Sequence, residues 1–285
     1  MPELPEVETV VRDLRTELDG QRFRAIDIIA PKSVHGSQRQ IEEALVGKKL
    51  KAVGRIGKSL YLDFGDYCLY IHLKMTGQLV WQHKRQIMAG GHPIINVGSE
   101  LPNKYTRAVL YFSNSHSLYF NDVRRFGWIK LVDQAMLETA RQKYGRDPLD
   151  PGFSGAVLAA LLKGKQKSII KAAIMDQSKL AGVGNIYADE ALFASRLMPD
   201  RLVSTLSPTD WSALAKAIKA VLLLSIKHRG TSFSDYRDGR GEKGNFVNFL
   251  KVYGRKNADC LKCGTALIKT RLAGRGAIYC PHCQK

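Results

Sequence analysis

Two cysteine pairs near the C-terminus constrain the fold of this chain more than any other sequence feature. Two residues separate Cys260 from Cys263 and Cys280 from Cys283, and sixteen residues lie between the pairs. This spacing lets both sulfurs of one turn bind the same ion, and two such turns complete a tetrahedral site. The sequence therefore predicts a small hairpin held by one zinc ion. Because protein fills all four ligand positions, we expect the zinc to be structural.

Basic residues lie between the two cysteine pairs. Lys269, Arg271 and Arg275 fall in this stretch, and residues 273–276 (AGRG) predict the tip of a β-turn. An arginine at the tip of a zinc-held hairpin suits contact with a DNA backbone. The fifth cysteine, Cys68, alternates into an apolar strand, so we expect it to pack in a core.

Hydrophobic spacing divides the rest of the chain into two patterns. Residues 5–19 predict an amphipathic helix, and from residue 22 to about 132 the spacing changes to the period of two that is typical of strands. Hairpins are expected at 60–73 and 110–120. A connection over about 82–104 is long enough to be a functional or disordered loop. This part predicts a β-sandwich or barrel that is preceded by the first helix.

Beyond residue 133 the spacing turns helical. Helices are expected at 134–144, 153–163, 168–176, 185–195 and 208–228. Residues 229–245 hold four glycines and few large apolar groups, which predicts a loop. The fold class is therefore α+β and multidomain.

The net charge indicates a polyanionic partner. The 285 residues include 44 Lys and Arg against 26 Asp and Glu, which gives a net charge of +18, and the last 59 residues alone hold 13 basic and four acidic residues. A basic balance concentrated in one segment is typical of nucleic-acid binding, and an anionic membrane surface is the main alternative. No run approaches the roughly 18 apolar residues of a membrane span. We also expect no secretory signal.

The first residues carry a second specific signal. Removal of Met1, which a small second residue permits, would leave Pro2 with a secondary amine at the N-terminus. On composition alone, the glutamates that follow are those of an acidic helix N-terminus.

A series of motifs follows in order along the chain: residues 1–9 (MPELPEVET), 58–61 (KSLY), 72–77 (HLKMTG), 122–127 (DVRRFG), 182–190 (GVGNIYADE), 253–255 (YGR) and the zinc hairpin. In this series the chain resembles the formamidopyrimidine-DNA glycosylase/endonuclease VIII family, and it is similar to the formamidopyrimidine branch.

The resemblance implies both a fold and an activity. Family members excise oxidised purines, chiefly 8-oxoguanine and formamidopyrimidines, from double-stranded DNA and then cut the strand at the abasic site. The implied fold is an N-terminal β-sandwich with a leading helix, a helix–two-turn–helix domain and a C-terminal zinc finger. We place the catalytic sandwich at 1–133, the helical DNA-binding domain at 134–228, a lesion-capping loop and connector at 229–250 and the zinc finger at 251–285.

The resemblance also assigns catalytic roles. Pro2 is implied as the nucleophile, and an α-amine suits this role because its usual pKa of about 8 leaves part of it neutral. Glu3 resembles the acid that assists opening of the sugar, and Glu6 a supporting carboxylate. Lys58 resembles the lysine that contacts the flanking phosphate and donates a proton in β-elimination. Arg275 resembles the zinc-finger arginine that is tied to the phosphate and to δ-elimination.

Further residues resemble DNA contacts. Met75, Arg124 and Phe126 are similar to the residues that fill the space vacated by a flipped base, and strand packing is the alternative for Met75 and Phe126. His72 and Asn185 resemble phosphate contacts, and a helix N-cap is the alternative role of Asn185.

Other positions depart from the family pattern or lie in its loop. Tyr105 stands where the family has a DNA-contacting histidine, and the preceding connection, about 83–104, is longer than expected. Gln166 stands where a DNA-binding lysine would align, so we expect its neighbours Lys165 and Lys167 to take that role. The segment that closes over the flipped base is expected to include Gly230, Thr231, Ser232 and Tyr236, with a plain linker as the alternative.

Three functions are compatible with these features. The first is a bifunctional glycosylase and abasic-site lyase acting on oxidised purines. The second keeps the mechanism but acts on oxidised pyrimidines, as endonuclease VIII does. The third is a non-catalytic zinc-ribbon DNA-binding protein, although binding alone gives no reason for Pro2, Glu3 and Lys58. We expect a monomer without an obligate protein partner or a membrane association, located in a bacterial cytoplasm and held at the nucleoid by its substrate.

Overall fold

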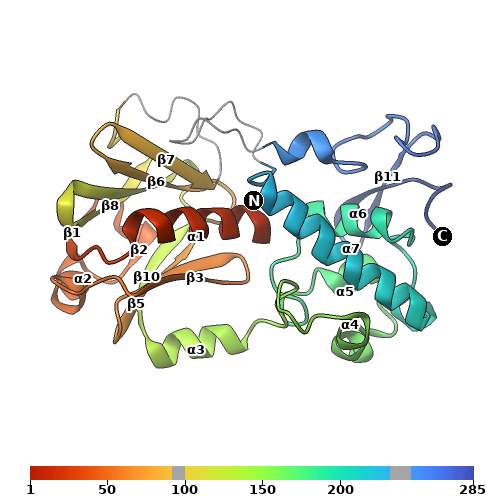
Figure 1. Ribbon diagram of the computed structural model, residues 1–285, viewed down its shortest axis with the longest axis horizontal. Coiled ribbons are helices and arrows are strands. Elements are labelled where there is room, and N and C mark those ends of the chain that lie inside the picture. The colour runs from red at the N-terminus through yellow and green to blue at the C-terminus, as the bar shows by residue number, and fades with distance from the viewer. Residues whose placement is uncertain (92–99, 232–244) are drawn as a thin grey trace. The chain divides into compact units, whose positions relative to one another are not determined.

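The computed structural model describes residues 1–91, 100–231 and 245–285, which form two compact units (Figure 1). The first unit comprises residues 1–142 together with 228–245, and the second comprises 143–227 together with 246–285. The segment that returns to the first unit is thus separated from it in sequence by the helices of the second. Within the described residues, no helix is long and apolar enough to cross a bilayer.

Helix α1 (Leu4–Leu18) opens the first unit as expected. Pro5 occupies its first turn, where a missing N–H costs nothing. One face is buried along its whole length through residues spaced three and four apart: Val7, Val10, Val11, Leu14 and Leu18. This face packs against β3 (Ala52–Ile56), β4 (Ser59–Asp63) and β7 (Gln86–Gly91), so the helix covers edge strands of both sheets (Figure 1).

The strands form two five-stranded sheets, as expected for a β-sandwich. The first has the order β1 (Phe23–Ile28), β8 (Thr106–Phe112), β9 (His116–Asp122), β6 (Gly77–His83) and β7. The second has the order β2 (Val34–His35), β10 (Trp128–Asp133), β5 (Tyr67–His72), β4 and β3. Only the short β2–β10 pair is parallel among these described ladders. Both expected hairpins are present, as β4–β5 and β8–β9.

A large hydrophobic core lies between the helix and the two sheets of this unit. Inward residues of both sheets contribute to it, and Phe23 meets Phe64 and Phe112 edge to face, with ring centroids 5.7 and 5.9 Å apart. Cys68 is fully buried, as its place in an apolar strand predicts.

Two elements of the first unit differ from the sequence prediction. Strand β7 lies inside the connection expected over 82–104 and pairs along its whole length with β6. Helix α2 (Gln38–Leu45) interrupts the region that was expected to be β-rich, and Ser37 and Gln40 cap its N-terminus reciprocally. Short 3₁₀ turns also lie at Pro31–Ser33 and Ser113–Ser115.

The second unit is helical at the expected positions. Its helices are α4 (Gly155–Leu162), α5 (Ile170–Ile174), α6 (Asn185–Ala194) and α7 (Pro208–Lys227), with 3₁₀ turns at Lys163–Lys165, Val203–Thr205 and Phe246–Phe249. Helix α7 packs on α4 and α6, and its buried face includes Trp211, Leu214, Ile218 and Leu222. The sequence analysis placed the domain boundary at residue 133. Helix α3 (Gln134–Gln142) nevertheless belongs to the first unit, because it packs on β5 and β10.

The chain ends in a two-stranded hairpin. Strands β11 (Ile268–Leu272) and β12 (Arg275–Tyr279) are joined by Ala273 and Gly274, whose φ angles are 45° and 76°. Two consecutive positive φ angles are typical of the tightest hairpin turns, which glycine favours. Strand β12 packs on α6, so the hairpin belongs to the second unit.

Candidate functional site

The buried carboxylate of Glu6 organises the N-terminal end of α1. Its Oε2 accepts a hydrogen bond from the Glu3 N–H at 2.9 Å, and its Oε1 accepts from the Thr231 N–H at 2.8 Å and the Thr231 hydroxyl at 2.9 Å. Pro2 and Glu3 are buried beside it. Gly230 has a φ of +85°, and a Cβ there would lie 3.0 Å from the Glu6 side chain. One carboxylate thus joins the chain's first residues to the segment after α7.

The segment after α7 is anchored at two further points. The Arg229 guanidinium pairs with both carboxylate oxygens of Asp13 on α1, and the Asn245 N–H donates to the His228 carbonyl at 2.9 Å. The two ends of the intervening segment therefore lie together. Gly230 and Thr231 are buried at its start, whereas Ser232 and Tyr236 lie outside the described residues.

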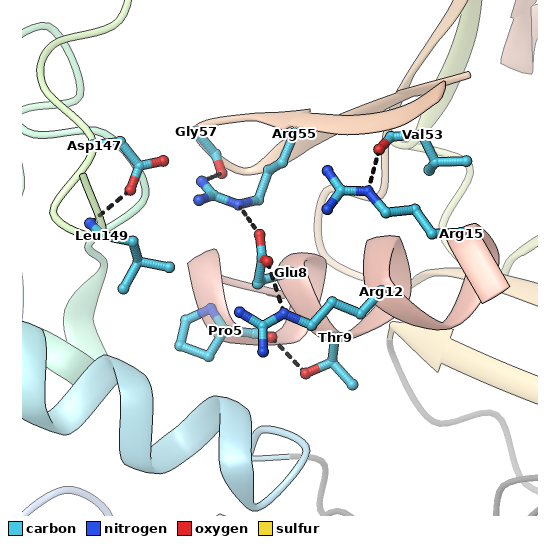
Figure 2. A network of polar contacts seen from close by, with 10 residues as sticks. All are labelled: Pro5, Glu8, Thr9, Arg12, Arg15, Val53, Arg55, Gly57, Asp147 and Leu149. Atoms are coloured by element: carbon cyan, nitrogen blue, oxygen red, sulfur yellow. Dashed lines mark hydrogen bonds and ion pairs between the residues drawn. The ribbon is translucent and has the colours of Figure 1, made fainter. Parts of the chain in front are cut away.

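Lys58 lies in the tight turn between β3 and β4, which an ion pair ties to α1. The Arg55 Nε donates to Glu8 at 3.0 Å, and its Nη1 donates to the Gly57 carbonyl at 2.9 Å (Figure 2). Lys58 itself is only 7% exposed. Helix α1, which carries Pro2 and Glu3 at its start, and the turn that carries Lys58 are therefore held in one frame.

Glu8 remains a carboxylate although it is largely enclosed. Burial favours its protonated form, but hydrogen bonds and charge from Arg12 and Arg55 outweigh burial and lower the pKa of Glu8. The ion pair between Glu8 and Arg55 therefore persists at neutral pH.

His72 lies at the end of β5 as a neutral imidazole. Its Nδ1 accepts a hydrogen bond from the Lys74 N–H at 2.9 Å, so the proton of the neutral ring is on Nε2. Burial, together with the charges of Lys74 and Lys58, lowers the pKa of His72 to about 4. At neutral pH this side chain offers an N–H donor without a positive charge.

The residues expected to fill a vacated base position lie on two neighbouring loops. Met75 is 41% exposed in the turn between β5 and β6, and Phe126 is 52% exposed in the loop between β9 and β10. The Arg124 guanidinium carbon lies 4.6 Å from the centre of the Phe126 ring. Strand packing, the alternative for Met75 and Phe126, is not what the structure shows.

The other expected DNA contacts lie in different settings. Tyr105 is half-buried, and its carbonyl accepts from the Asp122 N–H at 2.9 Å. Lys167 is exposed, whereas Lys165 forms a 2.9 Å ion pair with Asp176. Asn185 is the first residue of α6, and the N-cap is Gly184, so Asn185 does not take the alternative capping role. Asn185, Lys165 and Lys167 belong to the second unit, and the preceding residues of the site to the first.

The four cysteines converge as a zinc site requires. Their sulfurs all lie within 4.8 Å of one another, with Cys260–Cys283 at 4.0 Å and Cys263–Cys280 at 3.5 Å. Sulfurs bound to one zinc at about 2.3 Å lie about 3.8 Å apart in a tetrahedron. The residues present therefore fit one structural zinc ion, and the hairpin that it holds exposes Arg275 beside its tip.

Two buried charges that the sequence analysis did not single out, Lys171 and Asp189, hold this hairpin to α5 and α6. The Lys171 ammonium pairs with Asp189 at 2.6 Å and donates to the Gly276 carbonyl, while Asp189 accepts from the Ile278 N–H at 3.2 Å. Burial raises the pKa of Asp189 to about 6, against the opposing charge of Lys171.

Next along the helix, Glu190 accepts from the backbone N–H groups of residues 251–253 at 2.8 to 3.1 Å. Adjacent carboxylates of α6 thus hold both β12 and the chain that enters the zinc finger. Asp189 and Glu190 are the last two residues of the motif at 182–190, and this motif was the sequence signal that could have drawn attention to them. Lys171 follows Lys165 and Lys167 closely in the sequence, but it is 1% exposed and adds no charge to the surface.

Comparison with known proteins places the chain among DNA repair enzymes. Family models match residues 1–129 as a formamidopyrimidine-DNA glycosylase N-terminal domain, 144–237 as its H2TH domain and 260–285 as the zinc finger found in FPG and IleRS. Proteins named formamidopyrimidine-DNA glycosylase from Pelotomaculum thermopropionicum and Desulfitobacterium hafniense are 38% and 39% identical. The first match covers all of this chain and 99% of that protein, and the second covers both completely.

Solved structures agree with this placement. A mutant of the Lactococcus lactis FPG in complex with Fapy-dG containing DNA is similar with a TM-score of 0.85, at 31% identity over the whole of both chains. The Lactococcus lactis Fpg in complex with abasic-site DNA has a TM-score of 0.84 at 31% identity, over 99% of each chain. These matches confirm the three-part fold expected from the sequence. The chain belongs to the formamidopyrimidine-DNA glycosylase family.

Proposed function

We propose that this protein is a bifunctional DNA glycosylase and abasic-site lyase of base-excision repair that acts on 8-oxoguanine and formamidopyrimidines. The observation that carries the proposal is the frame around the start of α1, in which Glu6 binds the Glu3 N–H and Thr231 while Arg55 ties the Lys58 turn to the same helix. A chain that only bound DNA would have no use for a buried N-terminal proline held in this way.

The chemistry follows from the amine of Pro2. After loss of Met1, its nitrogen lone pair attacks C1′ of the damaged nucleotide, and the bond to the base breaks. The nitrogen loses its proton, and the departing base takes up a proton. Glu3 assists opening of the sugar ring as an acid. The product is an iminium ion with no proton on nitrogen, so it keeps its positive charge and acidifies the C2′ proton. Loss of that proton expels the 3′ phosphate, and a second elimination expels the 5′ phosphate.

Side chains around the amine supply proton transfer and phosphate binding. Lys58, in its fixed turn, donates a proton during β-elimination and contacts the flanking phosphate. Arg275, exposed on the zinc hairpin, contacts phosphate and assists δ-elimination. Zinc acts only through the structure, because four cysteines fill its coordination sphere.

Further contacts hold the damaged duplex. We assign phosphate contacts to His72, through its neutral N–H, and to Asn185, Lys167 and Tyr105, while Lys165 must first exchange its ion pair with Asp176. Gly230 and Thr231 begin the segment that we assign to closure over the flipped base, together with Ser232 and Tyr236. The protein acts as a monomer in the bacterial cytoplasm, at the nucleoid.

Borohydride trapping tests this proposal. Protein whose N-terminal mass shows Pro2 as the first residue is incubated with a duplex that carries 8-oxoguanine opposite cytosine, and borohydride reduces any iminium to a stable adduct. We expect an adduct that maps to Pro2, and neither an adduct nor strand cleavage from Pro2→Gly. Wild-type-like cleavage by Pro2→Gly would overturn the mechanism.

Two further duplexes separate the alternatives. Trapping on a thymine glycol duplex but not on 8-oxoguanine would move the specificity to oxidised pyrimidines. Failure to trap on a preformed abasic site, while DNA binding persists, would leave a DNA-binding protein without lyase activity.

A further inference from the structure

Two exposed loops depend on one buried carboxylate in the first unit. The turn at residues 74–76 carries Met75, and the loop at residues 123–127 carries Arg124 and Phe126. Asp122, the last residue of β9, is fully buried between the bases of these loops. It is the first residue of a sequence motif in which only the arginine and phenylalanine received roles.

The Asp122 carboxylate accepts hydrogen bonds from both loops. The Thr76 hydroxyl donates to Oδ1, the Arg124 N–H donates to the same oxygen at 3.1 Å, and the Gly127 N–H donates to Oδ2 at 2.6 Å. The Arg124 N–H also reaches the Thr76 hydroxyl oxygen, at 3.0 Å. The two loops are therefore joined directly to each other as well as through the carboxylate.

The backbone of both loops needs this support. Lys74 and Arg125 adopt φ angles of 49° and 57°, which residues other than glycine rarely adopt. A Cβ on Gly127 would lie 2.9 Å from both the His72 carbonyl oxygen and the Phe120 ring. The Arg107 Nε also donates to the Asp122 carbonyl at 2.7 Å and fixes the end of the strand. The backbone conformation of each loop is therefore unfavourable by itself, and the hydrogen bonds to Asp122 stabilise it.

This arrangement fixes the backbone of the two loops that carry the three exposed side chains. Met75 and Phe126 expose large apolar surfaces, and Arg124 lies against the Phe126 ring. A wedge that enters a base stack needs a defined position, since a misplacement of about 1 Å can cost about a hundredfold in rate where geometry controls a reaction. A rigid pair of loops provides that placement and spares the ordering entropy on DNA binding.

We propose that Asp122 is a positioning residue that sets Met75, Arg124 and Phe126 in one preorganised wedge, and that it thereby controls the rate of base extrusion. This inference rests on the proposed function, because it takes these three side chains to fill the vacated position. Asp122 contacts neither DNA nor the reacting atoms in this role. Its effect is greatest where a stacked base must be displaced and smallest where the site has already lost its base.

The test compares two substrates for Asp122→Asn, which keeps the shape of the side chain but replaces one accepting oxygen by a donor. Single-turnover rates are measured on an 8-oxoguanine–cytosine duplex and on a preformed abasic-site duplex. A 2-aminopurine next to the lesion reports the loss of stacking when the wedge enters. We expect base excision and the 2-aminopurine step to slow by about tenfold or more, and abasic-site cleavage by less than about threefold.

Two variants control this experiment. Thr76→Val removes the hydroxyl link at nearly constant volume and should give the same pattern of effects, even if Asp122→Asn folds poorly. Asp63→Asn alters another aspartate at a strand end, where Oδ1 accepts from the Gly65 N–H at 2.8 Å, and should leave all three rates unchanged.

Two outcomes would overturn the inference. Unchanged excision and 2-aminopurine rates in both Asp122→Asn and Thr76→Val would show that the wedge does not depend on this carboxylate. Equal loss on both substrates, together with a lower melting temperature, would assign Asp122 a purely structural role. Failure of the proposed function itself is distinguishable, because the unmodified protein would then show neither excision nor trapping.

Discussion

Buried carboxylates connect segments of this protein that are distant in sequence. Glu6 joins the start of α1 to Thr231, Asp122 joins two loops of the sandwich, and Glu190 holds the chain that enters the zinc finger. Each accepts backbone N–H groups whose burial would otherwise cost free energy, so each side chain fixes backbone as well as charge. The positions of functional groups at this scale therefore depend on the buried carboxylates beside them.

The neutral state of His72 makes the first unit sensitive to acid. Its folded pKa of about 4 lies below the usual 6.5, so the unfolded chain takes up a proton first as the pH falls. The associated stability is present above pH 6.5 and is lost between pH 6.5 and 4. We expect His72 to account for a loss of about 2 kcal/mol in the free energy of unfolding between pH 7 and pH 5.

Urea denaturation at the two pH values, followed by tryptophan fluorescence, measures this loss. Trp128 contributes to that signal, and its ring lies 5.8 Å from that of His72. His72→Gln should show a markedly smaller pH dependence, and His35→Gln, at an exposed position, should behave like the unmodified protein. An unchanged pH dependence in His72→Gln would contradict the assignment.

The Glu8–Arg55 ion pair gives a second residue-scale prediction. Their side chains are 13% and 6% exposed, so Glu8→Gln removes a negative charge that balances an enclosed guanidinium. We expect the free energy of unfolding to fall by about 2 kcal/mol, and strand cleavage to slow because the turn that carries Lys58 loses its tie to α1.

Glu43→Gln is the matched control, because its partner Arg39 and Glu43 itself are 88% and 60% exposed. Denaturation should show a change below about 0.5 kcal/mol for this variant. Equal stability of Glu8→Gln and the unmodified protein would show that the buried pair does not hold the frame.

At the scale of elements, the zinc hairpin depends on its metal more than on its own packing. Its core cluster contains few residues, and two of them, Cys260 and Cys280, are metal ligands. Binding of a structural zinc contributes on the order of 10 kcal/mol to folding in small zinc domains. We therefore expect Cys263→Ala to lose the hairpin, and with it the δ-elimination step assigned to Arg275.

Metal content measures this directly, with one zinc per chain expected for the unmodified protein and less for Cys263→Ala. Cys68→Ala removes the one cysteine outside the cluster and should keep the full zinc content. Stoichiometric zinc in Cys263→Ala would contradict a four-cysteine site.

The spacing of apolar residues was sufficient to predict the elements with strong periodicity. It was insufficient to predict contacts between residues that are distant in sequence. Helix α1, both expected hairpins and the helices of the second unit follow from local apolar spacing. Strand β7 was missed because its residues are mostly half-buried and end in two glycines, so they show no alternation. Helix α2 was missed although Ser37 and Gln40 form a readable capping box. Links such as Glu8 to Arg55 and Lys171 to Gly276 join residues 47 and 105 positions apart, and no local pattern encodes them.

For the whole molecule, the net charge of +18 predicts a strong dependence of DNA binding on salt. Each phosphate that the protein neutralises releases condensed counterions, so affinity falls steeply as salt rises. With at least about six phosphate contacts, binding to undamaged duplex should weaken by about a thousandfold or more between roughly 50 and 200 mM salt. Fluorescence anisotropy over a salt series measures the slope, and a flat slope would contradict an electrostatic mode of binding.

The return of the chain to its first unit has a consequence for synthesis. Glu6 and Asp13 emerge early from the ribosome, but Thr231 and Arg229, which bind them, follow only after the whole of α7 has been made. A nascent chain that has just completed its sandwich therefore lacks contacts that hold the start of α1, where we propose the nucleophile. A chain whose translation stops before residue 229 cannot form these contacts. The order of residues along the chain thus delays strand-cutting competence until the last quarter of the protein exists.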